Sequence, residues 1–260
     1  MDEAPPPDRA PLVQVIGLTM AFGDDVVQRD LQFDVRRGEV LAIMGPSGCG
    51  KSTLLRHMIG LQVPAAGQVL YGGQDLNECD DETLAELRRR FGVMFQSGAL
   101  WSSMSVGENV MLPLRLFSRQ RAAERRLRAQ WKLALVGLAD AFDLEPAELS
   151  GGMRKRAAIA RALALDPELL YLDEPSSGLD PLSSARLDGL ILNLRRNLGT
   201  TVVMVSHAID SIFAVADRAL YLDPQDKTML ALDAPDVLAD HGPPRVREFL
   251  RRGSTPAPRP

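Results

Sequence analysis

The stretch Gly45-Pro46-Ser47-Gly48-Cys49-Gly50-Lys51-Ser52 decides the fold of this chain. It satisfies the phosphate-loop pattern, in which two glycines separated by four residues are followed by Lys and Ser. The apolar segment Val40–Met44 precedes the loop, and residues 52–58 follow it without a helix breaker. Because a strand, a glycine-rich loop and a helix in that order are the context that the pattern requires, the sequence predicts a loop that binds nucleotide phosphates.

The residue types of this loop explain how it would bind a nucleoside triphosphate. Glycines let backbone N–H groups turn toward the β- and γ-phosphates, and the following helix directs its positive dipole end at them. Lys51 adds a positive charge there, and Ser52 offers a hydroxyl oxygen to Mg²⁺. The predicted nucleotide-binding residues are Gly45, Pro46, Ser47, Gly48, Cys49, Gly50, Lys51, Ser52 and Thr53.

Two carboxylates follow a second apolar segment, residues 169–172. Such a strand ending in acidic residues is typical of a Walker B segment, which reaches the nucleotide from the carboxyl edge of the sheet. Asp173 would hold Mg²⁺ through water, and Glu174 would orient or deprotonate the attacking water. In isolation the pair could equally cap the next helix, but the phosphate loop upstream favours the catalytic interpretation.

The composition of the chain limits the classes of protein to which it could belong. The chain has 260 residues, of which 45% are hydrophobic and 25% charged, as in an ordinary globular protein. A net charge of -4 supplies no overall attraction to nucleic acid or anionic lipid. Cys49 and Cys79 are too few for a disulfide framework, which favours a reducing cytoplasm. The longest apolar runs are strand-sized, and the acidic, proline-rich start does not resemble a signal peptide.

Hydrophobic periodicity divides the chain into α/β segments around a helical insertion. We expect a disordered leader at residues 1–11, a folded domain at 12–241 with a helical insertion at about 80–165, and a tail at 242–260 with a short amphipathic piece. The expected strands are 12–18, 31–35, 40–44, 169–172, 201–205 and 219–222. The expected helices are 52–58, 81–90, 106–117, 119–138, 150–165 and 182–198. In the fourth helix, Leu127, Trp131, Leu135 and Leu138 are predicted to form one buried stripe.

The segment Leu149-Ser150-Gly151-Gly152-Met153 lies before a basic helix. Ser150 alone would be assigned as the cap of that helix. Together with the phosphate loop and the Walker B segment, however, the segment resembles the signature of the ATP-binding-cassette family, in which glutamine usually replaces Met153. The resemblance implies that Ser150, Gly151 and Gly152 contact the γ-phosphate held by a second subunit, so that a head-to-tail homodimer encloses two ATP molecules with Mg²⁺.

The remaining family motifs follow in order along the chain. By resemblance, Phe22 stacks on adenine, although a lone phenylalanine is more often part of a core. Gln96 matches the Q-loop residue that senses Mg²⁺ and the attacking water, and Asp180 matches the D-loop residue that crosses the dimer interface. His207, which follows a strand, matches the switch histidine that binds the γ-phosphate, although a solitary histidine is usually structural.

This resemblance implies the fold and the activity. It implies a P-loop NTPase (RecA-like) core with a mostly parallel sheet, an antiparallel β subdomain and an inserted α-helical subdomain. The activity would be ATP hydrolysis coupled to transport, with Glu174, His207 and Gln96 as catalytic residues and Ser52, Gln96 and Asp173 around the metal. The implied setting is peripheral, on the cytoplasmic face of a bacterial inner membrane, beside an integral membrane permease and without nucleic acid.

Three further segments resemble the Mla/Mce-type ATPases: residues 95–110, 149–158 and 244–250. That group moves phospholipids or other lipids between the inner membrane and the outer envelope with a permease and an MCE-domain protein. The alternatives are another transport cargo, a non-transport role on DNA or ribosomes, and an ATP-binding regulator without hydrolysis. The amphipathic piece 245–252 is expected either to dock on the neighbouring ATPase subunit, as in that group, or to pack loosely on its own subunit.

Overall fold

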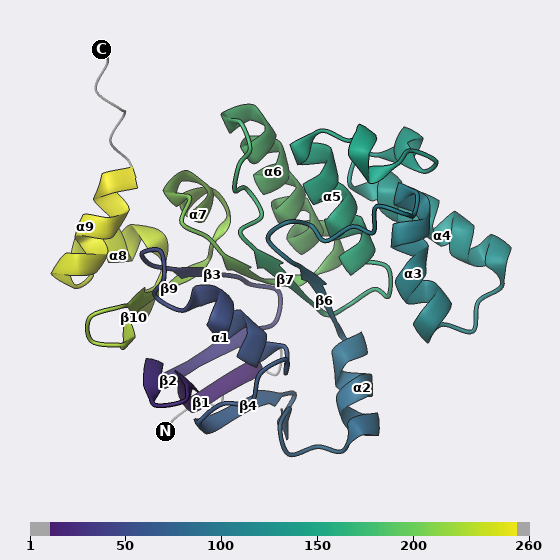
Figure 1. The fold of residues 1–260 in the computed structure, drawn as a ribbon. Coiled ribbons are helices and arrows are strands. Elements are labelled where there is room, and N and C mark those ends of the chain that lie inside the picture. The colour runs from purple at the N-terminus through teal and green to yellow at the C-terminus, as the bar shows by residue number, and fades with distance from the viewer. Residues whose placement is uncertain (1–10, 254–260) are drawn as a thin grey trace, which may run out of the picture.

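The computed structural model describes residues 11–253, with side chains as far as Arg251. The predicted disorder of residues 1–10 and of the last seven residues lies outside this part of the chain, whereas Pro11 already begins a strand. Two β-sheets form the framework of the structure. A group of helices lies beside one edge of the larger sheet, and the C-terminal helical segment lies beside its opposite edge (Figure 1). The structure therefore has the α/β architecture that the sequence predicts.

The smaller sheet has four strands in the order β2-β1-β4-β5, and its neighbours pair antiparallel. Its strands are β1 Pro11–Phe22, β2 Asp25–Arg36, β4 Ala66–Tyr71 and β5 Gln74–Asp75. Strands β1 and β2 form a long hairpin whose alternating residues bury one face, as the pattern Leu31, Phe33, Val35 predicts. Strands β4 and β5 were not predicted, because they are short and are flanked by glycines.

The larger sheet has six strands in the order β10-β9-β3-β8-β7-β6. Its strands are β3 Val40–Met44, β6 Phe91–Met94, β7 Leu169–Asp173, β8 Thr201–Val205, β9 Arg218–Asp223 and β10 Thr228–Asp233. All pairs are parallel except β9 with β10. Strand β6 corrects the prediction of an uninterrupted helical insertion, since Phe91-Gly92-Val93-Met94 pairs with β7 in the parallel sheet.

Helices cover both faces of the larger sheet (Figure 1). They are α1 Lys51–Met58, α2 Asp81–Arg89, α3 Val106–Phe117, α4 Ala122–Leu135, α5 Gly151–Ala162, α6 Pro181–Leu198, α7 Ile209–Val215, α8 Pro235–His241 and α9 Pro244–Gly253. Helix α1 contacts β1 of the small sheet and β7 and β8 of the large one, so it lies between the two sheets. Helices α3, α4 and α5 contact one another and form the helical subdomain.

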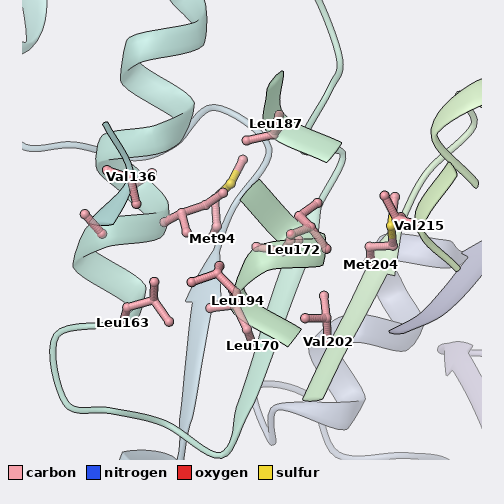
Figure 2. Close-up of a cluster of buried hydrophobic side chains, with 14 of the residues drawn as sticks. Met94, Val136, Leu163, Leu170, Leu172, Leu187, Leu194, Val202, Met204 and Val215 are labelled. Atoms are coloured by element: carbon pink, nitrogen blue, oxygen red, sulfur yellow. The ribbon is translucent and has the colours of Figure 1, made fainter. Parts of the chain in front are cut away.

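Alternation along the central strands supplies both cores. On one face, Leu170 and Leu172 of β7 join side chains from β8, α5 and α6, which Figure 2 shows converging from the sheet and its helices. On the other face, Leu169 and Tyr171 join the small sheet and α1. A parallel strand buried on both faces needs such an uninterrupted apolar run, which is the pattern that the sequence displays.

The predicted stripe of α4 is wrong for its first half. Leu127 and Trp131 are 69% and 53% exposed, although Leu135 and Leu138 do contact the core. The buried face of the helix carries Lys132 together with Ala129 and Leu133. Lys132 can be buried because its ammonium pairs with Asp166.

Helix α9 packs on its own chain. Val246 is fully buried and Leu250 is 1% exposed, and both belong to the larger core cluster. Arg245 pairs with Asp223 and Asp226 at the turn between β9 and β10. Two of the apolar side chains that motivated docking, Val246 and Leu250, are therefore buried within this chain, and Phe249 is half-buried. This packing favours the alternative in which the helix lies on its own subunit, while docking on a neighbouring subunit stays a prediction.

Alanine substitutions at two glycines should change the free energy of unfolding in opposite directions. A Cβ on Gly92 of β6 would lie 2.2 Å from the carbonyl oxygen of Ala162, whereas a Cβ on Gly189 of α6 would meet nothing within 4 Å. We expect Gly92→Ala to lower the free energy of unfolding by about 1 to 3 kcal/mol through overpacking. Gly189→Ala should raise it by up to about 1 kcal/mol, because alanine favours a helix. Denaturant unfolding measures both changes, and equal stabilities would contradict the packing of β6 on α5.

Candidate functional site

The phosphate loop follows β3, and residues from other strands pack closely against two of its glycines. Gly45 has φ 146°, and a Cβ there would lie 2.6 Å from the carbonyl oxygen of Leu222. Gly50 has φ 98°, and its Cβ would lie 2.7 Å from a methyl group of Val27. Because other residues rarely adopt these angles and would collide with neighbours, glycine is required at both positions.

The first turn of α1 is available to an anion. Gly50 caps the helix without a side-chain hydrogen bond, and no acidic residue lies in the first turn. Within residues 11–251, no side chain caps the N–H groups at this end, and the helix dipole makes them attractive to phosphate. The Lys51 ammonium is buried over the loop and donates to the carbonyl oxygens of Gly45 at 2.8 Å and Pro46 at 2.9 Å.

A cavity of about 360 Å³ opens above this loop. It brings together most of the residues that are predicted to bind the nucleotide within one chain. It also includes Val27, which was not predicted. Its lining comprises Phe22, Val27, Ser47, Gly48, Gly50, Lys51, Ser52, Thr53, Gln96 and Glu174. Gly45, Pro46 and Cys49 belong to the loop without lining the cavity. Phe22 is 55% exposed at its rim, so it is not part of the core.

Ser52, which lines the cavity, contacts Asp173, which does not line it. The Ser52 hydroxyl donates to Asp173 Oδ1 at 2.9 Å. Burial raises the pKa of the Asp173 carboxyl, and the nearby Glu174 charge adds to the increase, while the Ser52 hydrogen bond opposes it. The Ser52 hydroxyl and the Gln96 amide at the cavity, with the Asp173 carboxylate beside Ser52, are oxygen donors of the kind that Mg²⁺ prefers, so these residues fit the metal beside nucleotide phosphates.

Glu174 and His207 form a direct pair. His207 Nδ1 lies 2.8 Å from Glu174 Oε1, and the two residues follow the neighbouring strands β7 and β8. Glu174 is 7% exposed and has φ 49°, an angle that is unusual for a residue with a side chain. A carboxylate held at the cavity beside an imidazole can orient a water and accept its proton.

The signature residues lie apart from this cavity. Ser150 caps α5 by accepting a hydrogen bond from Met153 N at 3.2 Å, and Gly151 begins the helix. Ser150 and Gly152 line a second cavity, of about 180 Å³, which includes none of the phosphate-loop residues. Asp180 caps α6 and accepts from Ser183 N at 2.9 Å, which lowers the pKa of its carboxyl. A single chain thus leaves the predicted trans residues away from its own phosphate loop.

Gln28 is a supporting residue that the sequence did not reveal. It is fully buried in β2, and its Nε2 donates to the carbonyl oxygens of Cys49 at 2.8 Å and Asp223 at 3.0 Å. This bridge ties the phosphate loop to the end of β9. No sequence signal marks Gln28 or Val27, since both lie in a strand of ordinary composition.

Comparison with known proteins identifies the family. Residues 28–177 match the family described as ABC transporter. The chain belongs to the ABC transporter family. As a member with a complete phosphate loop and Walker B segment, it is an ATP-hydrolysing subunit of an ABC transporter.

Several relatives are similar along most of their length. The chain is 40% identical to the intermembrane phospholipid transport system ATP-binding protein MlaF of Haemophilus influenzae, over 92% of this chain and 90% of that protein. It is 41% identical to the probable ribonucleotide transport ATP-binding protein mkl of Mycobacterium leprae, over 92% of this chain and 68% of that protein.

Solved structures confirm the cassette fold. A dimeric post-hydrolysis state of the ATP-binding cassette MJ0796, bound to ADP and Pi, gives a TM-score of 0.77 at 33% identity and covers 85% of this chain and 98% of that one. The cbiO1 subunit from Clostridium perfringens, part of the cbiONQ transporter complex, gives 0.80 at 28% identity and covers 89% and 92%. The predicted core, antiparallel subdomain and helical subdomain are therefore confirmed. Among residues 11–253, no helix has the length and apolarity that crossing a bilayer demands.

Removing the ammonium of Lys51 tests the placement of the phosphate loop. Lys51→Ala should weaken ATP binding by about 10- to 100-fold, because a hydrogen-bonded charge is worth about 1.5 to 3 kcal/mol. Lys132→Met removes another buried ammonium outside the cavity and should leave ATP affinity unchanged. Titration of a fluorescent ATP analogue measures both affinities, and undiminished binding by Lys51→Ala would refute the placement.

Proposed function

We propose that this chain powers the movement of phospholipids between the two membranes of a bacterial envelope. The observation that carries this proposal is the 40% identity to a phospholipid-transport ATPase, which extends over 92% of this chain and 90% of that relative. The resemblance of residues 95–110 and 149–158 to Mla/Mce-type ATPases supports it. In this proposal the chain forms a homodimer on the cytoplasmic face of the inner membrane with a permease and an MCE-domain protein.

The nucleotide step uses the residues around the cavity. The phosphate loop would hold the triphosphate, with Phe22 against the base and Thr53 beside the phosphates, and Ser52, Asp173 and Gln96 would hold Mg²⁺. Bound Mg²⁺ would neutralise phosphate charge. Glu174 accepts a proton from the attacking water, and His207, paired with it, turns to the γ-phosphate. Ser150, Gly151 and Gly152 of a second copy complete the site, and Asp180 lies at the dimer interface.

The surface of α3 supports contact with a membrane subunit. Leu116 and Phe117 are 65% and 53% exposed at its end, and Trp101, in the segment that leads from Gln96 to α3, is 59% exposed. Exposed large apolar side chains on and next to one helix favour contact with a partner protein over bulk water. We assign this surface to the permease.

A second cargo has support of similar strength. The chain is 41% identical to a protein whose name assigns it to ribonucleotide transport, although it spans only 68% of that relative. Co-purification from membrane extract separates the two cargoes. The phospholipid proposal expects an MCE-domain protein, a permease and bound glycerophospholipid. Recovery of a permease with a solute-binding protein and no lipid would contradict it.

Replacing the proposed base isolates the chemical step. Glu174→Gln should retain ATP binding and lower turnover by about 10²- to 10⁴-fold, because general-base catalysis is lost while the phosphate contacts remain. The variant should accumulate as an ATP-bound dimer on size exclusion. Glu86→Gln, an exposed carboxylate of α2, serves as the control and should keep wild-type turnover. Normal turnover by Glu174→Gln would remove Glu174 from the mechanism.

A further inference from the structure

A buried lysine joins two of the proposed catalytic residues. Lys155 lies in the second turn of α5 and is 9% exposed. Its ammonium donates to the carbonyl oxygen of Glu174 at 3.0 Å and to the carbonyl oxygen of Gln96. One side chain thus contacts the backbone of the proposed base and of the Q-loop residue together.

The environment of Lys155 makes these contacts strong. Burial lowers the pKa of its ammonium, while the charges of Glu174 and Asp173 oppose that decrease. A buried cation requires hydrogen-bond acceptors, and the two carbonyl groups supply them. In a site of low dielectric, such charge-assisted bonds restrain their partners more than bonds between neutral groups do.

Glu174 needs a restraint of this kind. Its backbone has φ 49°, a conformation that residues with a Cβ adopt rarely and keep only where the surroundings impose it. Its N–H donates to the carbonyl oxygen of Val205 at 3.0 Å, and its own carbonyl accepts from Lys155 at 3.0 Å and from Ser177 N at 3.3 Å. The sheet therefore fixes one side of the unusual residue, and Lys155 fixes the other together with the turn at Ser177.

Helix α5 also holds the Q-loop at a second place. Arg161 donates to the carbonyl oxygens of Gly98 at 2.9 Å and Ala99 at 2.6 Å. Between the two cations, Ala158 lies 3.5 Å from a Cβ built on Gly98. The Q-loop therefore runs along α5, and among the side chains that the structure describes it is Lys155 that hydrogen-bonds both Gln96 and Glu174.

We infer that Lys155 is a positioning residue that fixes the Glu174 carboxylate and Gln96 relative to each other for ATP hydrolysis. The inference rests on the proposed roles of those two residues. Without the ammonium, the Glu174 carbonyl loses its charge-assisted hydrogen bond, which leaves the bond from Ser177 N at 3.3 Å, and the Q-loop loses its link to Walker B. ATP binding does not depend on this link, because Lys155 does not line the nucleotide cavity.

Because Lys155 lies on α5, its contacts with Glu174 and Gln96 have a further consequence. The helix begins at the signature residues Ser150 to Gly152, which are proposed to contact the nucleotide of the partner, and Lys155 lies one turn later. Closure of the dimer on the signature would therefore move the residue that positions the base in the same subunit. Lys155 connects the trans contacts of α5 with the cis site.

The test compares kcat, KM and ATP affinity in the full-length chain. Lys155→Met keeps the aliphatic part of the side chain and removes the ammonium. It should lower kcat by about 100-fold, because misplacing a catalytic group by about 1 Å costs that much. The dissociation constant for ATP should stay within about threefold of wild type. Lys155→Arg, which can donate to both carbonyl groups, should recover at least about tenfold of the lost kcat.

Two comparisons make the result decisive. Lys132→Met removes a buried ammonium on α4 that pairs with Asp166, so it reports the effect of lost stability alone and should keep wild-type kcat. If Lys155→Met folds poorly, Lys155→Gln with retained ATP binding replaces it and should show the same loss of kcat.

The outcomes separate this inference from the proposed function. A kcat for Lys155→Met within about threefold of wild type, or an equal loss in Lys132→Met, would overturn the role of Lys155. Turnover retained by Glu174→Gln would overturn the assignment of the base and this inference with it. An inactive Glu174→Gln beside an active Lys155→Met would overturn the inference alone.

Discussion

The parallel pairing of β3, β8 and β7 is the constraint on which the site depends. Ile43 lies opposite Val205, and Val205 lies opposite Asp173, so the three strands end at one level. The segments that follow are the phosphate loop, His207 and Glu174. Parallel strands buried on both faces leave polar groups only at their ends, so the chemistry collects at the carboxyl edge of the sheet.

Placing these groups at the sheet edge has energetic costs, which contacts with other residues offset. Burial at the sheet edge raises the pKa of Asp173, so Ser52 must donate a hydrogen bond to favour the charged form. Glu174 reaches the cavity only by adopting a left-handed backbone angle, so its amide and carbonyl need outside partners. The phosphate loop likewise depends on Gln28 behind it. Supporting residues of this kind offset the cost of holding reactive groups out of water.

The sequence predicts the elements whose signals are local. The bounds of β3, α3 and β8 match their expected ranges, and the phosphate loop is recognisable because its glycines meet a steric requirement. Strand β6 was missed because Phe91-Gly92-Val93-Met94 is short, contains a glycine and lies between helices. The exposed face of α4 was misjudged because Lys132 counts as polar in the sequence, while the fold buries its aliphatic chain and pairs its charge. Such contacts join residues distant along the chain, and periodicity does not encode them.

The signature residues Ser150 and Gly152 lie apart from the phosphate loop, as the proposed head-to-tail dimer requires. Ser150 and Gly152 line a cavity of their own, which shares no lining residue with the cavity above the phosphate loop. Helix α5 nevertheless contacts Glu174 of its own chain through Lys155, which lies in the second turn of the helix. In the proposed dimer, a helix that contacts the partner's nucleotide at its start and its own site along its side would couple the two positions mechanically. Dimer closure and alignment of the base would then be one motion, so that hydrolysis waits for assembly.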